Sequence, residues 1–277
     1  MTGLASRVAL ASCGVLASAV LSPPSAGAEP VIDRGFTSVT ADLTPRAADE
    51  FEGPQGQPPD PSLWNIRAGG GGWGNFEKQV YTGDAGNVRL DGLGNLVIEA
   101  RLNDGEITSA RIDTLGKADL GFGVVAARIK MPQGQGLHPA FWMLGDSLEA
   151  VGYPGSGEID IIEVVNDARR AYFSVHGPML DPSTPKWKLS TNHDGANLAD
   201  DFHTYWLSKR PGHLVIGIDE DPLAVFDLSE LPPEANWVQD APFFALLNLA
   251  AAGEWPGPLD PAVLPAQMLV DWVRFYE

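Results

Sequence analysis

Short runs in which apolar and polar residues alternate at every second position dominate this chain of 277 residues. Such alternation is typical of β-strands that bury one face, and turn-forming residues, among them 31 Gly and 23 Pro, separate the runs. We find no amphipathic helix longer than about two turns. The runs recur roughly every 8 to 15 residues, which predicts an all-β sandwich or barrel. The clearest are Leu96–Arg101, Thr108–Thr114, Gly123–Met131, His203–Lys209, Leu214–Glu220 and Gln267–Tyr276.

The charge balance excludes one broad class of partner. The chain has 36 Asp and Glu against 18 Lys and Arg, which gives a formal net charge of −18. Binding to nucleic acid needs a basic stripe, and the only adjacent basic pairs are Arg169-Arg170 and Lys209-Arg210. We therefore expect no nucleic-acid partner. Hydrophobic residues make up 44% of the chain and 8 residues are Trp, so a large core can form.

The first 28 residues have the build of a secretory signal peptide. Arg7 precedes the apolar stretch Val8–Leu21, and Ala26-Gly27-Ala28 is a small-residue cleavage site. The apolar stretch is shorter than the ~20 residues needed to span a bilayer. We expect cleavage after Ala28, a secreted or extracellular protein, with a cell-wall or periplasmic location as alternatives, and no membrane contact after cleavage. An uncleaved anchor and a lipoprotein signal at Leu10–Cys13 are the other interpretations.

The remaining chain, residues 29–277, is predicted to be one domain. No linker or change of composition divides it, and Cys13, the only cysteine, lies before it, so no disulfide can form there. Val31–Asp49 is weakly patterned and is interpreted as a first strand with an entry loop. We expect a monomer.

The segment Gly157–Glu163, with the sequence GEIDIIE, carries the most specific chemistry. In a strand, Glu158 and Asp160 share one face, but strict alternation puts Glu163 on the other. A β-bulge at Ile161-Ile162 would return Glu163 to the face of the first two carboxylates. Three like charges on one face repel one another, so the arrangement indicates a function. Chance placement on an acidic surface is the alternative.

Two chemical interpretations of these carboxylates remain open at this point, paired-carboxylate catalysis and a divalent-cation site. About four strand steps separate Glu158 from Glu163, roughly 13 Å between α-carbons. Retaining glycosidases hold their carboxyl groups ~5–5.5 Å apart, a distance that two long side chains leaning together on a concave sheet could approach. The spacing therefore favours a reaction that retains the anomeric configuration, without proving it.

Ordered motifs around this segment resemble glycoside hydrolase family 16, in its bacterial endo-β-1,3-glucanase (laminarinase) branch, whose signature is E-I-D-x-x-E. The motifs that carry the resemblance are Asp49–Phe51, Trp73–Asn75, Ser109–Arg111, Glu158–Glu163, Pro139–Leu144, Asp201–Tyr205, Leu247–Leu249, Trp255–Gly257 and Val270–Tyr276. The resemblance implies a single-domain curved β-sandwich, a concanavalin-like jelly roll, with a substrate cleft along its concave face. It further implies that Glu158 is the nucleophile and Glu163 the general acid/base. Asp160 would tune charge and orientation between them.

Several residues are candidates for binding sugar. The glycines of Gly69–Gly74 would let the backbone approach a polymer, while Trp73 stacks on a sugar and Asn75 binds hydroxyls; a floppy loop is the alternative. Arg111 lies between Ala110 and Ile112 and should face the cleft if those two are core, although a solvated surface arginine is the alternative.

The remaining candidates depend more on the resemblance. Trp142 belongs either to the core or, as the family implies, to the cleft. Trp255 is a loop tryptophan expected to stack on sugar. Tyr153 stands where many members carry Trp and should still stack. His176 matches the family's cleft histidine and could orient a carboxylate, although a structural role is equally compatible with the sequence.

No cofactor is needed for the chemistry, but the family implies a structural Ca²⁺ held by backbone carbonyls and an Asp, which would map to Glu50, Gly94 and Asp271. Unbranched β-1,3-glucan is the leading substrate, followed by mixed-linkage glucan and β-1,3-galactan. Two alternatives to hydrolysis stay open. A non-catalytic β-glucan-binding module can use the same fold, although this chain keeps all three carboxylates. A transglycosylase would use the same glycosyl-enzyme and pass it to a sugar.

Overall fold

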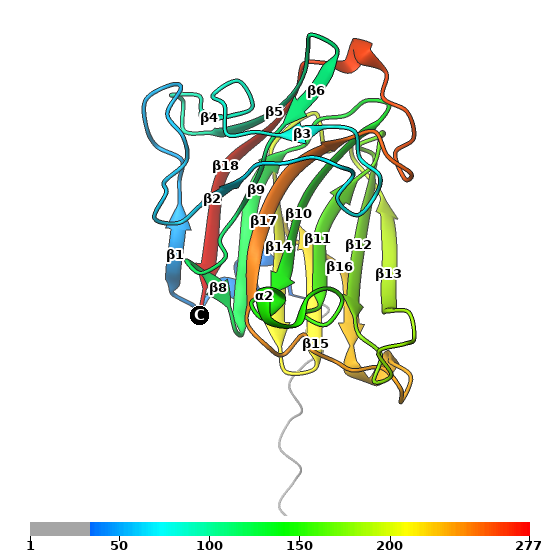
Figure 1. Cartoon of the computed structure of the whole chain (residues 1–277). Helices are drawn as coiled ribbons and strands as arrows, with labels where there is room; N and C mark the ends of the chain where they lie inside the picture. The colour runs from blue at the N-terminus through cyan, green and yellow to red at the C-terminus, as the bar shows by residue number, and fades with distance from the viewer. Residues whose placement is uncertain (1–33) are drawn as a thin grey trace, which may run out of the picture. The chain divides into compact units, whose positions relative to one another are not determined.

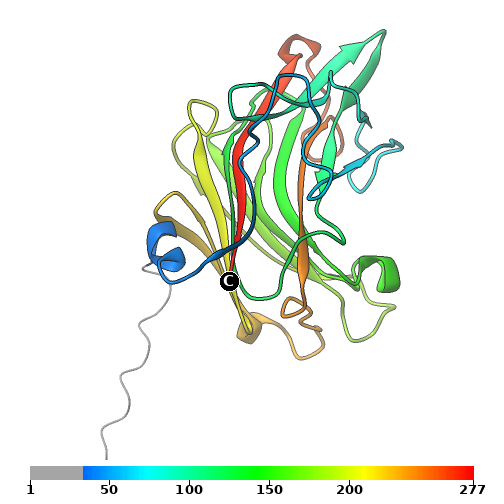
Figure 2. The ribbon, with the colours of Figure 1, turned by 90° about the vertical axis from the view of Figure 1, so that its left-hand side faces the viewer.

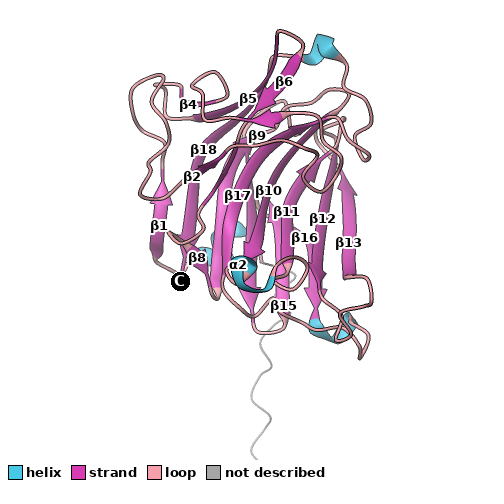
Figure 3. Cartoon of the chain, viewed as in Figure 1, coloured by secondary structure: helices cyan, strands magenta, loops and turns pink. Residues whose placement is uncertain are grey.

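Two sheets pack face to face in the computed structural model, which describes residues Arg34–Glu277, and their strands pair antiparallel except for β3 with β6 (Figures 1 and 3). These residues belong to one compact unit, Ile32–Glu277. The sandwich confirms the all-β prediction. The proposed signal peptide, residues 1–28, lies outside the described residues. Among the residues described, no helix is long and apolar enough to cross a membrane.

The eight-stranded sheet forms the floor of the cleft described below. Its strand order is β13-β12-β11-β10-β17-β7-β2, with β8 beside β17. The strands are β13 (Trp187–Asp194), β12 (Arg170–Gly177), β11 (Glu158–Val164), β10 (Leu137–Gly145), β17 (Phe243–Ala251), β7 (Arg111–Asp113), β2 (Asn65–Arg67) and β8 (Asp119–Leu120).

The ten-stranded sheet covers the other side of the core. Its order is β16-β15-β14-β9-β18-β5-β6-β3, with β1 beside β18 and β4 beside β5. Figure 2 shows its long strands curving together with those of the other sheet. The strands are β16 (Asp221–Asp227), β15 (His213–Ile218), β14 (His203–Arg210), β9 (Gly123–Lys130), β18 (Ala266–Tyr276), β5 (Leu96–Asn103), β6 (Glu106–Ser109), β3 (Val80–Tyr81), β1 (Pro45–Asp49) and β4 (Val88–Leu90).

Helices are few and short in the described part of the chain, as the absence of a long amphipathic pattern predicts. They are α1 (Phe36–Thr40), α2 (Leu148–Val151) and the 3-10 turns η2 (Leu228–Glu230) and η3 (Pro261–Val263). The entry segment differs in part from the expectation, because α1 precedes the expected first strand. Its Phe36 stacks on Trp272 of β18, with ring centres 6.1 Å apart, which holds the turn against the sheet.

The predicted strand Thr108–Thr114 is wrong as a single element. The chain crosses from one sheet to the other at Ala110, so that β6 ends at Ser109 in the ten-stranded sheet and β7 begins at Arg111 in the eight-stranded sheet. Ala110 is fully buried between the sheets. Alternation continues through this crossing, which is why the sequence pattern cannot reveal it.

Inward-facing residues of both sheets form one continuous hydrophobic core. On the central strand β17, Phe243, Ala245, Leu247 and Leu249 enter this core, while the residues between them face the cleft side of the sheet. Fully burying each Phe or Leu side chain contributes about 1.5–3 kcal/mol. The core therefore fixes which face of β17, and of its neighbour β10, is left for function.

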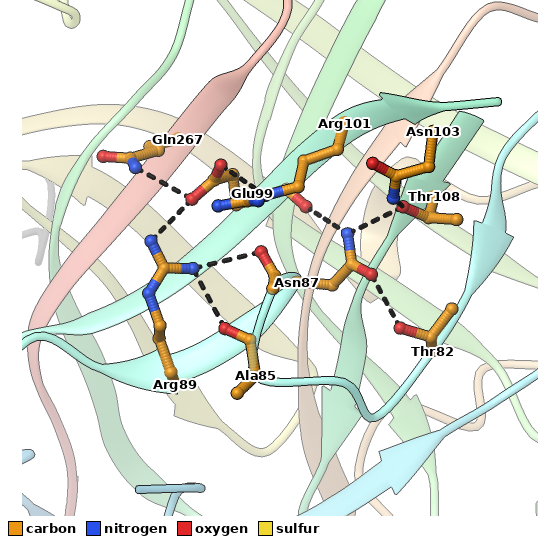
Figure 4. Close-up of polar contacts among 10 residues, drawn as sticks. Thr82, Ala85, Asn87, Arg89, Glu99, Arg101, Asn103, Thr108 and Gln267 are labelled. Atoms are coloured by element: carbon orange, nitrogen blue, oxygen red, sulfur yellow. Dashed lines mark hydrogen bonds and ion pairs between the residues drawn. The ribbon is translucent and has the colours of Figure 1, made fainter. Parts of the chain in front are cut away.

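A buried polar cluster joins β4, β5, β6 and β18 (Figure 4). Arg89 and Arg101 each hold a nitrogen 2.6 Å from a carboxylate oxygen of Glu99, and Gln267 donates to the same carboxylate at 2.9 Å. The Asn87 side-chain amide donates to the Glu99 carbonyl at 2.9 Å. The cluster holds the β5–β6 hairpin, and β6 in turn pairs with β3, which brings Tyr81 to the cleft.

Candidate active site

Strand β11 carries the three carboxylates past a bulge. Trp142 of β10 pairs with Asp160, and the preceding Phe141 pairs with Ile162, which leaves Ile161 as the extra residue. The isoleucines of β11 are fully buried in the core, whereas Glu158, Asp160 and Glu163 line one cleft. The bulge expected at the apolar doublet is therefore present, and it brings Glu163 to the face of the other two carboxylates.

The cleft has a volume of about 480 Å³ and lies over β10, β11 and β17. It brings together every residue that the sequence proposed for chemistry or sugar binding. These residues are Trp73, Asn75, Arg111, Trp142, Tyr153, Glu158, Asp160, Glu163, His176 and Trp255.

Asp160 lies at the centre of a buried polar group. The Ser174 hydroxyl donates to Oδ2 of Asp160 at 2.9 Å, and Nε2 of His176 lies 3.3 Å from the same oxygen and 3.4 Å from Oε1 of Glu158. These two carboxylates and the imidazole offer ligand atoms within 4.8 Å of one another. His176 thus contacts the carboxylates, as the cleft interpretation expected, and the trio could orient a carboxylate or hold a cation.

Burial raises the pKa of Glu158 well above its usual range, and the nearby Asp160 raises it further, while Lys186 acts in the opposite direction. Burial also raises the pKa of Glu163, with a further contribution from Asp160. A nucleophile must be ionised to attack, whereas a general acid must hold its proton. Because the carboxylates interact closely, their protonation is a property of the cluster.

An arginine lies between two tryptophan rings in the cleft. The Arg111 guanidinium carbon is 4.8 Å from the ring centre of Trp73 and 4.6 Å from that of Trp142. Ala110 and Ile112, its neighbours, are fully buried in the core, so alternation turns Arg111 to the cleft as expected. Trp142 faces the cleft too, and its Nε1 donates to Oδ1 of Asn248 at 2.7 Å.

The glycine-rich loop is held in a defined conformation. Trp73 has a positive φ of 30° and its Nε1 donates to the Gly70 carbonyl at 3.0 Å. The Asn75 carbonyl and side-chain oxygen accept hydrogen bonds from Glu254 and Trp255. Asn75 therefore ties two cleft loops together, while its buried Nδ2 has no partner among the described residues.

Two aromatic side chains stand at the cleft wall with a large exposed area. Tyr153 is 46% exposed and lies under the ammonium group of Lys186, which is 4.7 Å from the ring centre. Trp255 is 41% exposed and packs edge-on against Tyr172 and His138. Exposed rings of this kind offer apolar faces to sugars.

Sequence reasoning missed six polar residues that also line the cleft. They are Glu77, Tyr81, His138, Lys186, Lys188 and Asn248. Alternation along β10 gives a signal for His138, because it lies at even spacing from Trp142. The lysines offer no comparable signal, because they come from the edge strand β13 and its approach, which turn to this face through cross-strand pairing.

The residues proposed for calcium lie outside the cleft and have other partners. Glu50 binds Arg274 through two hydrogen bonds of 2.8 Å, and Asp271 pairs with Arg128 at 2.5 Å. Gly94 lies beside the carboxylate of Glu52. In the predicted site Glu50 and Gly94 offer backbone carbonyls and Asp271 its carboxylate, so a cation would compete only with Arg128, for Asp271. The calcium site stays a prediction, and a melting temperature unchanged by chelation would contradict it.

A two-sheet β-sandwich with two glutamates and an aspartate on one bulged strand, in a cleft walled by aromatic rings, is the architecture of a glycoside hydrolase. The family model described as Glycosyl hydrolases family 16 matches residues 77–274, and the chain belongs to this family.

Relatives and solved structures agree with this assignment. The chain is 37% identical over 234 residues to a "Beta-glucanase" of Rhodothermus marinus, and the match covers 79% of this chain and 80% of the relative. The laminarinase catalytic domain of Thermotoga maritima superposes with a TM-score of 0.76 at 33% identity, over 85% of this chain and 98% of that one. A non-specific endo-β-1,3(4)-glucanase, SCLam, superposes with a TM-score of 0.76 at 32% identity, over 86% and 95%. That structure, of a mutant form of SCLam, presents a 1,3-β-D-cellobiosyl-glucose at the active site.

Proposed function

We propose that this protein hydrolyses β-1,3-glucan internally and with retention of anomeric configuration. The observation that carries the proposal is the set of carboxylates on β11, Glu158, Asp160 and Glu163, which line one open cleft. The names of the relatives, a β-glucanase and a laminarinase, support the substrate class. Aromatic rings along the cleft suit the apolar faces of a neutral polysaccharide.

In the proposed mechanism, Glu158 attacks the anomeric carbon and forms a covalent glycosyl-enzyme, while the bond to the leaving sugar breaks. Glu163 gives its proton to the departing oxygen and then takes a proton from the water that hydrolyses the intermediate. Asp160, held by Ser174, lies beside the nucleophile and orients it. All of these proton transfers use side chains of this chain.

Product analysis on laminarin, lichenan, agarose and β-1,3-galactan tests the proposal. Early in the reaction we expect oligosaccharides of many lengths from laminarin, which indicates internal cleavage. Glu163→Ala should release no products. Wild-type protein that binds insoluble β-1,3-glucan without releasing reducing ends would instead identify a binding module. Faster cleavage of lichenan would identify mixed-linkage glucan as the preferred substrate, for which the relative SCLam gives precedent.

We also propose that the protein is exported and loses residues 1–28. The support is the apolar stretch with its small-residue cleavage site, Ala26-Gly27-Ala28. N-terminal sequencing of the protein recovered outside the cells should begin at Glu29. Full-length protein that remains with the membrane fraction would favour an uncleaved anchor.

A further inference from the structure

His138 of β10 contacts the residue proposed as the general acid/base. Its Nε2 lies 2.9 Å from Oε1 of Glu163, although the two residues are 25 positions apart in the chain. Its side chain is 10% exposed and packs against the ring of Trp255 in a T-shaped pair, with ring centres 5.1 Å apart. His138 is therefore fixed in place and has little surface with which to touch a sugar.

The other ring nitrogen decides which way this hydrogen bond runs. Nδ1 of His138 is buried and has no hydrogen-bond partner among the described residues. A neutral imidazole carries one N–H, and a buried donor without a partner is costlier than a buried acceptor without one. The proton therefore belongs on Nε2, which donates to Oε1 of Glu163. This leaves Oε2 of Glu163 to carry the acid proton.

We propose that His138 is a positioning residue for the acid/base step: its Nε2–H holds Oε1 of Glu163, so that the proton on Oε2 meets the departing glycosidic oxygen. The inference rests on the proposed function and adds a residue to it. A fixed carboxyl group loses less orientational freedom when the substrate binds, and proton transfer depends on such geometry.

Other charged and titratable groups face this pair from each element packed around it. They are Glu77 from the loop before β3, Glu158 and Asp160 from β11, Tyr172 and His176 from β12, and Lys188 from β13. Burial alone would lower the pKa of His138, but the hydrogen bond and the charge of Glu163 raise it. Burial raises the pKa of Glu163, whereas the hydrogen bond from His138 lowers it.

Removing the donor gives a consequence with a definite sign. Without the hydrogen bond from His138 the carboxylate form of Glu163 is less favoured, so the pKa of Glu163 rises. The basic limb of the kcat/KM profile, which reports loss of the acid proton, then moves to higher pH. A side chain that only fills space at position 138 would not move this limb.

The test compares His138→Phe, which keeps an aromatic ring without the donor, with His138→Gln, which keeps a neutral N–H. On laminarin we expect kcat of His138→Phe to fall about tenfold or more with KM little changed, because general acid catalysis contributes ~10²–10⁴-fold. His138→Gln should recover most of kcat and keep the wild-type basic limb. His213→Phe is the matched control, because His213 also binds a carboxylate, Asp227 at 2.7 Å, but does not line the cleft.

A second substrate isolates the acid step. The 2,4-dinitrophenyl glycoside of laminaribiose has a leaving group that departs without a proton, so His138→Phe should form the glycosyl-enzyme from it at close to the wild-type rate. That rate is read from the pre-steady-state release of dinitrophenolate. His138→Leu replaces the Phe variant if circular dichroism shows that the latter is unfolded.

The outcomes separate this inference from the proposed function. Wild-type protein inactive on both substrates would overturn the proposed function. Active wild type with His138→Phe unchanged in kcat and in its basic limb would overturn the role of His138 alone. Equal losses of rate in the Phe and Gln variants, with the basic limb unmoved, would likewise show that His138 only fills space.

Discussion

The guanidinium carbon of Arg111 lies 4.6 Å from the ring centre of Trp142, and β7 and β10, which carry the two residues, are both neighbours of β17. The same guanidinium is 4.8 Å from Trp73 on the glycine-rich loop. A planar cation in contact with two rings restrains the orientation of both. The stack thus links the sheet that forms the cleft floor to the loop that forms its wall.

Arg111→Lys should weaken substrate binding more than it slows the chemical step. Lysine keeps the charge but cannot stack as a plane on two rings, and cation–π contacts contribute about 0.5–2 kcal/mol. We expect KM for laminarin to rise roughly 2- to 30-fold with kcat little changed, measured by initial rates. Arg169→Lys, an exposed substitution outside the cleft, is the control. Equal KM for wild type and Arg111→Lys would show that the stack does not order the sugar site.

Glu158→Gln should abolish hydrolysis and at the same time stabilise the fold at neutral pH. Burial raises the pKa of Glu158 in the folded protein, so the folded state binds more protons than the unfolded state above the usual pKa of Glu. Stability is therefore lost as pH rises from that value through the raised one. The Gln variant lacks this loss, and its melting temperature should exceed that of wild type near pH 7 but not at pH 4.

Thermal melts at several pH values, together with laminarin assays, check this prediction. Glu234→Gln, on an exposed turn, controls for removing one negative charge from an acidic protein. Retained turnover in Glu158→Gln would contradict the assignment of Glu158 as the nucleophile. A melting temperature that stays below that of wild type at neutral pH would contradict the idea that the buried charge is a cost to folding.

Glu99→Gln should destabilise the sandwich, although Glu99 does not line the cleft. Burial would raise the pKa of Glu99, but hydrogen bonds from Arg89, Arg101 and Gln267 lower it overall (Figure 4). Glu99 is 1% exposed, and removing its charge leaves two arginines without their partner. We expect a loss of about 1–3 kcal/mol, measured by denaturant unfolding, because the arginines are partly exposed and Arg89 keeps bonds to two carbonyls. Its pH dependence has the opposite sign to that of Glu158, because the stability that Glu99 contributes is lost as pH falls through its lowered pKa.

The exposed Glu106→Gln, in the same hairpin, is the matched control for Glu99→Gln. It should leave the free energy of unfolding within about 0.5 kcal/mol of wild type. If both variants lose the same stability, the cluster in Figure 4 contributes no more than a surface charge.

Local alternation in the sequence was enough to predict which residues of one strand face the cleft. Ala110 and Ile112 enter the core and Arg111 leaves it, and the bulge in β11 was predicted from the apolar doublet alone. Both predictions depend on positions within one strand, where a period of two decides the face. The crossing at Ala110 was missed because the pattern on either side of it is the same.

Contacts between strands could not be predicted in this way. His138 meets Glu163 only because β10 and β11 pair with a register that shifts at the bulge, and no local pattern specifies that register. The raised pKa of Glu158 has the same origin, because it depends on burial by neighbours far away in the chain. The sequence thus identified the carboxylates, and the pairing of strands determines their environment.

Lys209 of β14 offers the last prediction, because it is a fully buried cation far from the proposed chemistry. Its ammonium group donates to the carbonyls of Gly121 and of Ala241, the latter at 2.8 Å, and lies 4.6 Å from the ring centre of Phe122. Burial lowers the pKa of Lys209 to about 8. Between that value and the usual 10.5 the unfolded chain binds more protons than the folded one, so stability gains a contribution as pH rises.

Lys209→Met should remove that contribution. At pH 7 the variant loses two hydrogen bonds to loop carbonyls but also escapes the cost of burying a charge, so the two effects oppose each other there. Any deficit relative to wild type should grow between about pH 8 and pH 10, because only wild type gains stability there. Denaturant unfolding of both proteins at each pH gives the difference directly, and Lys130→Met, which removes an exposed contact to the Asp200 carbonyl, is the control. A deficit that is constant from pH 7 to pH 10 would mean that Lys209 titrates in the folded protein as an ordinary lysine does.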